Sequence, residues 1–181
     1  YLHIERIKDE PLEIEFEEKP ESFKVLAEMI KQGVCKFSAP ITTNIKANRI
    51  SYMIEVEGTL ITKVYLPCSR CLNEYETTLN SRFNLTYVNQ LPTEPEDVEP
   101  EEIEISAQLV GLIYFQGEEI NLRDGIQEQA VMAFPIRPLC RENCKGLCAA
   151  CGADLNQGDC SCDLTPISNK FAALKDLKLD E

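Results

Sequence analysis

Eight of the nine cysteines stand in closely spaced sets, and their spacing suits a metal ion. One upstream pair is separated by two residues, and six more cysteines crowd the last quarter of the chain: Cys68, Cys71, Cys140, Cys144, Cys148, Cys151, Cys160 and Cys162. Thiolates two to four residues apart can face one ion from a single turn, as tetrahedral zinc sites require. The run Cys148-Ala149-Ala150-Cys151-Gly152 has the form of a zinc knuckle, in which Gly152 gives the turn its backbone freedom.

The cysteine count leaves the ligand sets open. Cys148 and Cys151 form one pair, which Cys160 and Cys162 could complete across the intervening loop, while Cys140 and Cys144 compete for the same places. If all eight bind, two four-cysteine sites result, and Cys68 and Cys71 join one of them. An iron–sulfur cluster would also take four thiolates. The ninth cysteine, Cys35, is expected to be a small buried hydrophobe.

The other residue types argue against catalysis. The only histidine is His3, near an end of the chain where we expect fraying, so a zinc site here must be all-cysteine or nearly so. All-thiolate zinc is closed and structural, whereas catalytic zinc keeps an open position. One histidine leaves little room for Cys–His or Ser–His–Asp nucleophiles, and no P-loop or G-x-G-x-x-G motif is present. We therefore predict structural zinc, no small-molecule substrate and no enzyme activity.

Composition places the chain among cytoplasmic globular proteins. It has 181 residues, 44% of them hydrophobic, and no apolar run approaches the roughly 20 residues that span a bilayer. No export signal is visible, so we expect the cytoplasm and no membrane partner. Thiols stay reduced there, which favours metal binding over disulfides.

The net charge of −13 is unevenly distributed. Residues 1–21 carry a net charge of −5, residues 22–90 carry +3 and residues 91–181 carry −11. An acidic chain is a poor general binder of nucleic acid, because phosphate contacts supply most non-specific affinity. The basic middle segment could still touch RNA, and the acidic ends could attract a very basic protein such as a ribosomal protein. Solubility alone would also explain much of the acidity.

Hydrophobic periodicity predicts an α+β fold. Leu12–Glu17 alternates apolar and acidic residues as a half-exposed strand does, and 21–32 has the apolar face of a helix that Gly33 ends. From 40 to 91 the pattern is that of consecutive strands, including one over Ile50–Val56 that Gly58 breaks and one over 77–88. Short turns between them suggest an antiparallel, partly barrel-like sheet, with Cys68 and Cys71 at a strand end.

The remaining segments complete the prediction. Asn121 can cap a helix over 122–134, after a short strand within 109–115. Residues 91–104 hold seven acids and three prolines, which indicates a solvated loop, and 168–177 is compatible with a closing helix. We therefore divide the chain into a β-rich core, residues 1–138, and a cysteine-rich, zinc-knuckle-like module, residues 139–181.

Four cations are the candidates for partner binding: Arg49, Lys63, Arg70 and Arg82. They accompany tyrosines in the β segment, and sheets with basic and aromatic side chains can hold RNA. Ordinary solvated strands give the same pattern, and no RNP-type motif is visible.

The two cysteine blocks together resemble the YceD family. Val64-Tyr65-Leu66-Pro67-Cys68-Ser69-Arg70-Cys71-Leu72 is similar to its C-x-R-C-L signature. The second block is similar from Pro138-Leu139-Cys140 onward, with Cys144, Gly146-Leu147-Cys148, Cys151-Gly152, Leu155-Asn156, Cys160 and Cys162, and the ending 171–177 resembles the family's closing helix. Ala149 departs from a common proline, and Thr165-Pro166-Ile167 from Asp-Pro-Arg, which puts in doubt a role for a basic residue there.

The resemblance implies a non-enzymatic factor that supports the accumulation or processing of large-subunit ribosomal RNA, or ribosome assembly. Its partner would be precursor rRNA, a basic ribosomal protein or both, with Arg70 and the Cys68–Cys71 corner as first contacts. Two alternatives remain. One is a thiol-based redox or metal-sensing protein, against which Cys68-x2-Cys71 follows a strand and does not open a helix. The other is a nuclease, for which the acids form tracts and no magnesium constellation.

Overall fold

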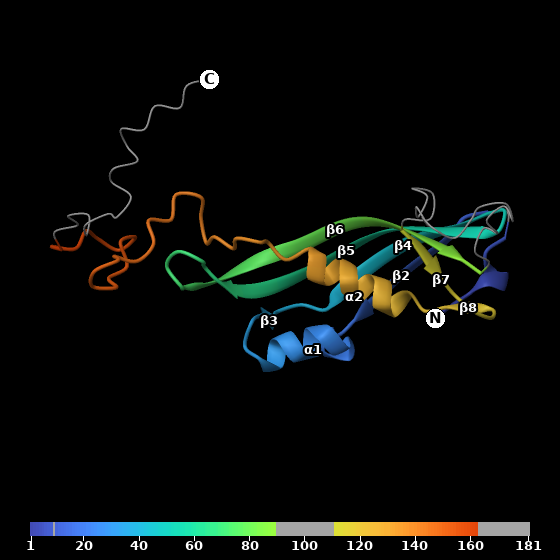
Figure 1. Ribbon diagram of the computed structural model, residues 1–181, viewed down its shortest axis with the longest axis horizontal. Coiled ribbons are helices and arrows are strands. Elements are labelled where there is room, and N and C mark those ends of the chain that lie inside the picture. Colours follow the sequence, from blue (N-terminus) through green and yellow to red (C-terminus); the bar gives the residue numbers. More distant parts are fainter. Residues whose placement is uncertain (9, 90–110, 163–181) are drawn as a thin grey trace, which may run out of the picture.

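A mostly antiparallel sheet forms the body of the protein, in a computed structural model that describes residues 1–8, 10–89 and 111–162 (Figure 1). The strand order in the sheet is β2-β4-β5-β6-β7. In addition, β3 pairs with β5, beyond the residues of β5 that pair with the start of β4. Only β7 runs parallel to its neighbour, β6. The strands are β2 (Leu12–Glu18), β3 (Lys36–Phe37), β4 (Ile41–Ile50), β5 (Met53–Pro67), β6 (Glu74–Val88) and β7 (Leu112–Tyr114). The α+β prediction is confirmed, and the described sheet does not close into a barrel.

Two α-helices pack against one face of this sheet (Figure 1). They are α1 (Lys24–Lys31), preceded by the 3₁₀ turn η2 (Pro20–Ser22), and α2 (Leu122–Met132). Gly33 follows α1 at a φ of 73°, as expected of a residue that ends a helix. The Asn121 side chain accepts a hydrogen bond from the Arg123 amide, so the predicted cap of α2 is confirmed. The predicted loop 91–104 and closing helix 168–177 lie outside the described residues.

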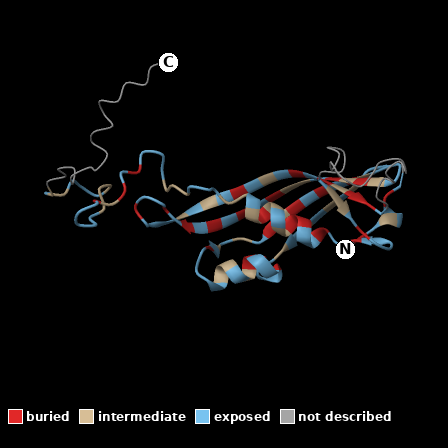
Figure 2. Cartoon of the chain, in the orientation of Figure 1, coloured by how far each residue is buried: buried red, intermediate tan, exposed pale blue. Residues whose placement is uncertain are grey.

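Buried residues alternate with more exposed ones along β5 and β6, which Figure 2 shows as coloured bands, so every second residue of these strands faces the core. The core packs these strand residues against the two helices and includes Ile41, Ile45, Val56, Leu60, Leu85, Phe23, Leu26 and Ile126. Cys35 is buried with Val64, Leu66 and Leu79, so its prediction as a small hydrophobe is confirmed. The opposite face of the sheet has no described helix over it (Figure 1).

The strand predicted at Ile50–Val56 was wrong in its bounds. The chain turns at Ser51 and Tyr52, where Ser51 has a φ of 58°, so the alternating run spans a hairpin between β4 and β5. Gly58 does not break β5 either. Gly58 lies opposite Phe83 on β6, whose ring covers the space that a side chain at Gly58 would occupy. An aromatic partner of this kind fills the gap that a strand glycine leaves.

The N-terminal residues are held in place and are not frayed. β1 (Leu2–His3) pairs with β8 (Glu119–Ile120), and the 3₁₀ turn η1 (Ile4–Arg6) follows. His3 Nδ1 lies 3.2 Å from Glu119 Oε1. Leu2 is fully buried in the main core, which is why this end of the chain is ordered against the sheet.

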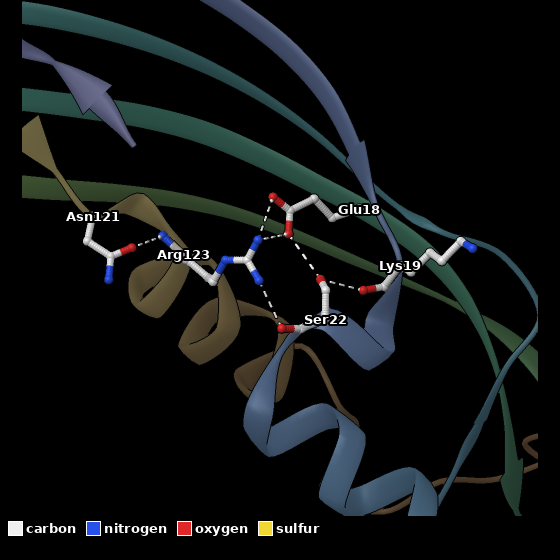
Figure 3. Close-up of polar contacts among 5 residues, drawn as sticks. All are labelled: Glu18, Lys19, Ser22, Asn121 and Arg123. Carbon is white, nitrogen blue, oxygen red and sulfur yellow. Dashed lines mark hydrogen bonds and ion pairs between the residues drawn. The ribbon is translucent and has the colours of Figure 1, made fainter.

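Arg123 on α2 ties the helical layer to the end of β2 (Figure 3). Its guanidinium donates to the Ser22 carbonyl at 2.9 Å and lies 3.0 Å from Glu18 Oε2. The same group lies over the Phe23 ring, 5.5 Å from its centroid. These contacts fix where α2 begins, and therefore where its C-terminal end points.

We predict that Gly58→Ala lowers the free energy of unfolding by about 1–3 kcal/mol, because the new methyl group would overlap the Phe83 ring and force it out of the core. Chemical denaturation at a fixed metal concentration measures the change. Gly158→Ala is the matched control, since a methyl group there meets nothing within 4 Å. Equal stability of the two variants would show that Phe83 moves aside freely.

Candidate metal centre

The β5–β6 hairpin carries the first two cysteines to one end of the molecule. Its strands pair from Met53–Val88 to Pro67–Glu74, and beyond the β3 pairing at Tyr65 it continues as a two-stranded ribbon. Cys68 and Cys71 lie in the turn that follows, as the sequence predicted for a strand end. The turn is closed by the Leu72 amide, which donates to the Cys68 carbonyl at 2.9 Å.

The segment that follows α2 brings Cys140 and Cys144 to this turn. After α2, Phe134 packs edge-on against Phe37, with ring centroids 6.2 Å apart, beside the base of the ribbon. The Pro138 carbonyl then accepts hydrogen bonds from the Ser69 amide and hydroxyl, each at 2.8 Å. The chain is thereby docked on the hairpin turn two residues before Cys140.

Arg70 completes this docking from the hairpin side. Its guanidinium donates to the Cys144 carbonyl at 2.8 Å and to the Glu142 carbonyl at 3.3 Å, and its own carbonyl accepts from the Leu147 amide at 3.2 Å. The side chain predicted as a first partner contact is therefore engaged in holding the cysteine-rich segment, although Arg70 remains exposed.

The first group of sulfurs, from Cys68, Cys71, Cys140 and Cys144, has the dimensions of a zinc tetrahedron. All four lie within 4.8 Å of one another, and the Cys68–Cys144 and Cys71–Cys140 separations are 3.8 and 3.7 Å. Four sulfurs around one zinc at a bond length of about 2.3 Å lie about 3.8 Å apart. Three of these residues are buried, and all four are free thiols. The donor set therefore fits a closed tetrahedral metal.

The second group is formed within the cysteine-rich segment alone. The sulfurs of Cys148, Cys151, Cys160 and Cys162 also lie within 4.8 Å of one another, and Cys151 is exposed. The knuckle turn repeats the first one: the Gly152 amide donates to the Cys148 carbonyl at 2.9 Å, and Gly152 has a φ of 74°. Both turns thus place a residue of left-handed backbone conformation directly after their second cysteine: Leu72 (φ 60°) after Cys71 and Gly152 after Cys151.

Both groups contain sulfurs whose pKa is lowered: Cys68 and Cys144 in the first group and Cys148 in the second. Burial raises the pKa of the Cys68 thiol, but the amides of Cys140, Cys71 and Arg70 donate to its sulfur and bring the pKa down to about 6. The amides of Cys151 and Ala150 likewise lower the pKa of Cys148 to about 6. Donors to sulfur favour the thiolate, which is the form that binds metal.

Crowding among thiols raises the pKa of other members of each group. Burial and the neighbouring thiols of Cys71 and Cys144 raise the pKa of Cys140 to about 12. The Cys151 thiol and burial raise the pKa of Cys162 to about 12. A dication would displace these protons, so metal uptake at either group releases protons.

The structure brings the eight cysteines together in two sets, a grouping that the spacing left open. Cys140 and Cys144 lie with Cys68 and Cys71, and Cys148, Cys151, Cys160 and Cys162 form a set of their own. Two four-cysteine groups that could hold a metal ion therefore exist, and the identity of the metal as zinc stays a prediction.

Sequence reasoning missed two residues of this centre. Leu72 has a φ of 60°, a conformation that costs a side-chain-bearing residue about 1–2 kcal/mol. Comparing the two C-x-x-C motifs could have revealed it, since glycine follows the second. Asn156 lies in the block that resembles the YceD family, but its motif position did not indicate that its side chain donates to Cys144 Sγ, at 3.4 Å.

The four cations predicted to contact a partner do not form one patch. Lys63 and Arg82 project from the open face of the sheet, opposite Thr78 and Thr59 respectively. Arg49 lies near the end of β4 opposite Ile54, on the face that α1 and α2 cover, and Arg70 lies at the hairpin turn. Their role in binding remains a prediction.

The fold and these two groups define a β-rich protein with a thiolate module that could hold two metal ions. The YceD family, described as "Large ribosomal RNA subunit accumulation protein YceD", matches residues 56–178. The match covers more than half of the chain and contains both cysteine groups. The chain therefore belongs to the YceD family.

Curated relatives agree with this assignment. An uncharacterized protein of Mycobacterium leprae is 29% identical over 126 residues, covering 67% of this chain and 52% of the relative. The chloroplastic "Large ribosomal RNA subunit accumulation protein YCED homolog 1" of Arabidopsis thaliana is 23% identical over 156 residues, covering 77% and 49%. The chain thus spans about half the length of these relatives. No solved structure matches it, and within the described residues no helix is long and apolar enough to cross a membrane.

We predict that the metal-loaded protein holds two metal ions per chain. Cys140→Ser removes the first metal and Cys160→Ser the second, each leaving one, because every group has four ligands. Cobalt(II) substitution reports each tetrathiolate by its charge-transfer absorption. Cys35→Ser is the control and keeps both metals, since Cys35 lies in the core. Retention of both ions by either variant would contradict these ligand sets.

Leu72→Gly should raise the free energy of unfolding of the metal-loaded protein by about 0.5–1 kcal/mol, as relief of the left-handed strain exceeds the added chain entropy. The Leu72 side chain is 65% exposed, so little packing is lost. Denaturant titration gives the change, and Leu72→Ala, which retains the strain, is the control. If alanine stabilises as much as glycine, the backbone strain is not the cause.

Proposed function

We propose that this protein is a non-enzymatic factor that supports the accumulation of large-subunit ribosomal RNA, through ribosome assembly or rRNA processing in the cytoplasm. The observation that carries the proposal is the YceD family match, which spans the hairpin and the cysteine-rich segment together. The name of the Arabidopsis relative, a large ribosomal RNA subunit accumulation protein homolog, points the same way. The cytoplasm suits the free thiols, because thiols stay reduced there.

In this proposal the metal is zinc and its role is structural. A tetrathiolate zinc supplies a cross-link between chain segments and keeps no open coordination position for a reactant. The first group would cross-link the hairpin turn to the start of the cysteine-rich segment. Hydrogen bonds to the Pro138 carbonyl and from the Arg70 guanidinium already hold these two chain segments side by side. The hairpin end then becomes a rigid surface for a partner.

The described residues also support a role without catalysis. Apart from the two cysteine groups, no cluster of three or more cysteine, histidine or acidic side chains in the described ranges is close enough to hold a metal. A magnesium-dependent nuclease would need such a carboxylate cluster. The tetrathiolate groups themselves match the structural kind of site.

Charge favours a basic protein as the partner over RNA. The open face of the sheet presents seven glutamates from three strands: Glu13, Glu15, Glu17, Glu55, Glu57, Glu74 and Glu76. It presents four cations in the described strands, Lys36, Lys46, Lys63 and Arg82. RNA phosphates would be repelled by this surface, whereas a lysine- and arginine-rich protein of the assembling large subunit would be attracted.

Affinity capture from native lysate tests the proposal, with and without ribonuclease, at low and high salt. We expect a basic large-subunit protein to be retained after ribonuclease and released at high salt, because the attraction is electrostatic. A charge-reversal variant, Glu13→Lys with Glu15→Lys and Glu57→Lys, should lose it. Neutral Thr42→Ala with Thr86→Ala on the same face is the control.

Other results would change the proposal in definite ways. Large-subunit precursor RNA that disappears with ribonuclease would make RNA the partner. Recovery of neither would remove support for a ribosomal role and favour the redox or metal-sensing alternative, for which the exposed Cys151 would be the reactive thiol.

A further inference from the structure

We infer that the two four-cysteine groups bind their metals cooperatively, and that Asn156 is the positioning residue that couples them. The inference rests on the metal binding proposed above and goes beyond it, because two independent structural sites would serve the proposed function equally well. Asn156 lies between Cys151 and Cys160, in the loop that the second group closes, yet its side chain serves the first group.

The Asn156 side chain is bonded on both of its polar atoms. Its Nδ2 donates to Cys144 Sγ at 3.4 Å and to Asp154 Oδ1 at 2.7 Å, and its Oδ1 accepts from the Lys145 amide at 2.8 Å. These partners fix the amide orientation, because the reverse assignment would face the amide oxygen toward a thiolate and a carboxylate. The second loop therefore supplies a directed donor to a ligand of the first group.

Asp154 holds Asn156 in this position and connects the loop to the hairpin. Its Oδ1 also accepts from the Asn156 amide at 2.9 Å, and its Oδ2 accepts from Asn73 Nδ2 at 2.9 Å. Asn73 follows the first knuckle, so the carboxylate joins the second loop to the turn that carries Cys68 and Cys71. The hydrogen bonds around Asp154 keep its pKa below the usual range, with the Asn156 amide as the largest cause.

Backbone hydrogen bonds also connect the second loop to the first group. Only three residues separate Cys144 from Cys148, and within them Leu147 forms an antiparallel bridge with Asp154. The Leu155 amide donates to the Gly146 carbonyl at 2.9 Å, and the Cys148 amide to the Ala153 carbonyl at 2.8 Å. Gly146, at a φ of 78°, lies so close to the Arg70 carbonyl that an added β-carbon would be 3.1 Å from it. The second loop is thus packed on the first group through backbone as well as side chains.

The second loop has little else to hold it in shape. From 149 to 162 no described residue is buried, and the chain forms no helix there and no strand beyond the isolated bridge. Without metal in the second group, only these hydrogen bonds would hold the loop, and Asn156 with it, beside the first group. Metal binding at the second group would order the loop and hold Asn156 beside Cys144, which strengthens metal binding at the first group. Because such coupling is reciprocal, metal binding at the first group strengthens metal binding at the second by the same factor.

Titration of the metal-free full chain with cadmium, followed by thiolate charge-transfer absorption and native mass spectrometry, tests the coupling. At partial loading of the wild type we expect mostly metal-free chains and chains with two cadmium ions, and few with one. This measurement needs no variant. Chelator competition then gives the affinity of the first group, and ¹¹³Cd NMR reports its ligand environment.

Asn156→Leu, which leaves all eight cysteine ligands in place, should weaken cadmium binding at the first group by about 10–100-fold and shift its ¹¹³Cd resonance. Asn143→Leu is the matched control: it makes the same change beside Cys144, at an exposed residue for which the structure records no side-chain hydrogen bond. When Cys160→Ser and Cys162→Ser disable the second group, the first should already be weakened, and adding Asn156→Leu should weaken it little further.

Each other outcome overturns a different statement. Two cadmium ions that bind independently, with an Asn156→Leu affinity equal to that of Asn143→Leu, would overturn the coupling and leave structural zinc intact. A chain that takes up no metal would overturn both. Circular dichroism of each variant checks that the sheet remains folded.

Discussion

The convergence of four sulfurs at the end of the β5–β6 hairpin is the constraint on which the cysteine-rich half of the structure depends. The apolar cluster there contains only three buried residues, Cys68, Cys71 and Cys144, with a few half-buried neighbours such as Leu139 and Leu147. Full burial of a leucine is worth about 1.5–3 kcal/mol. Zinc bound to a tetrathiolate peptide contributes roughly 10–16 kcal/mol, so with the proposed zinc bound, metal–sulfur bonding would outweigh packing in this module.

The sheet makes this convergence possible over a long stretch of sequence. Cys71 and Cys140 are far apart in the chain, but α2 packs on β5 and β6 and delivers Phe134 to the base of the ribbon. Only a short segment must then be ordered to bring Cys140 to the turn, which keeps the entropy of loop closure small. A two-stranded ribbon is only marginally stable in water, so its end in turn gains from being cross-linked.

Local patterns predicted what depends on local chemistry. Alternation located β2 and β6, the Asn121 cap located α2, and the cysteine spacing indicated two possible groups. Contacts between distant segments decided the rest. Gly58 remains within β5 because Phe83 pairs with it across strands. No local pattern could reveal that partner, nor that Cys144 would join Cys68, 76 residues away, with Asn156 beside it.

Metal occupancy bears on the choice between protein and RNA as partner. In the described residues from 135 to 162, three cations, Arg137, Arg141 and Lys145, balance three acids, Glu142, Asp154 and Asp159. Four thiolates around one Zn²⁺ carry a net charge of −2, so two filled groups would add −4 to this otherwise neutral segment. The hairpin end would then have the same sign as the glutamates on the open face of the sheet. A continuous anionic surface of this kind attracts a basic protein chain and repels phosphate, and zinc would thereby set the charge of the surface as well as its shape.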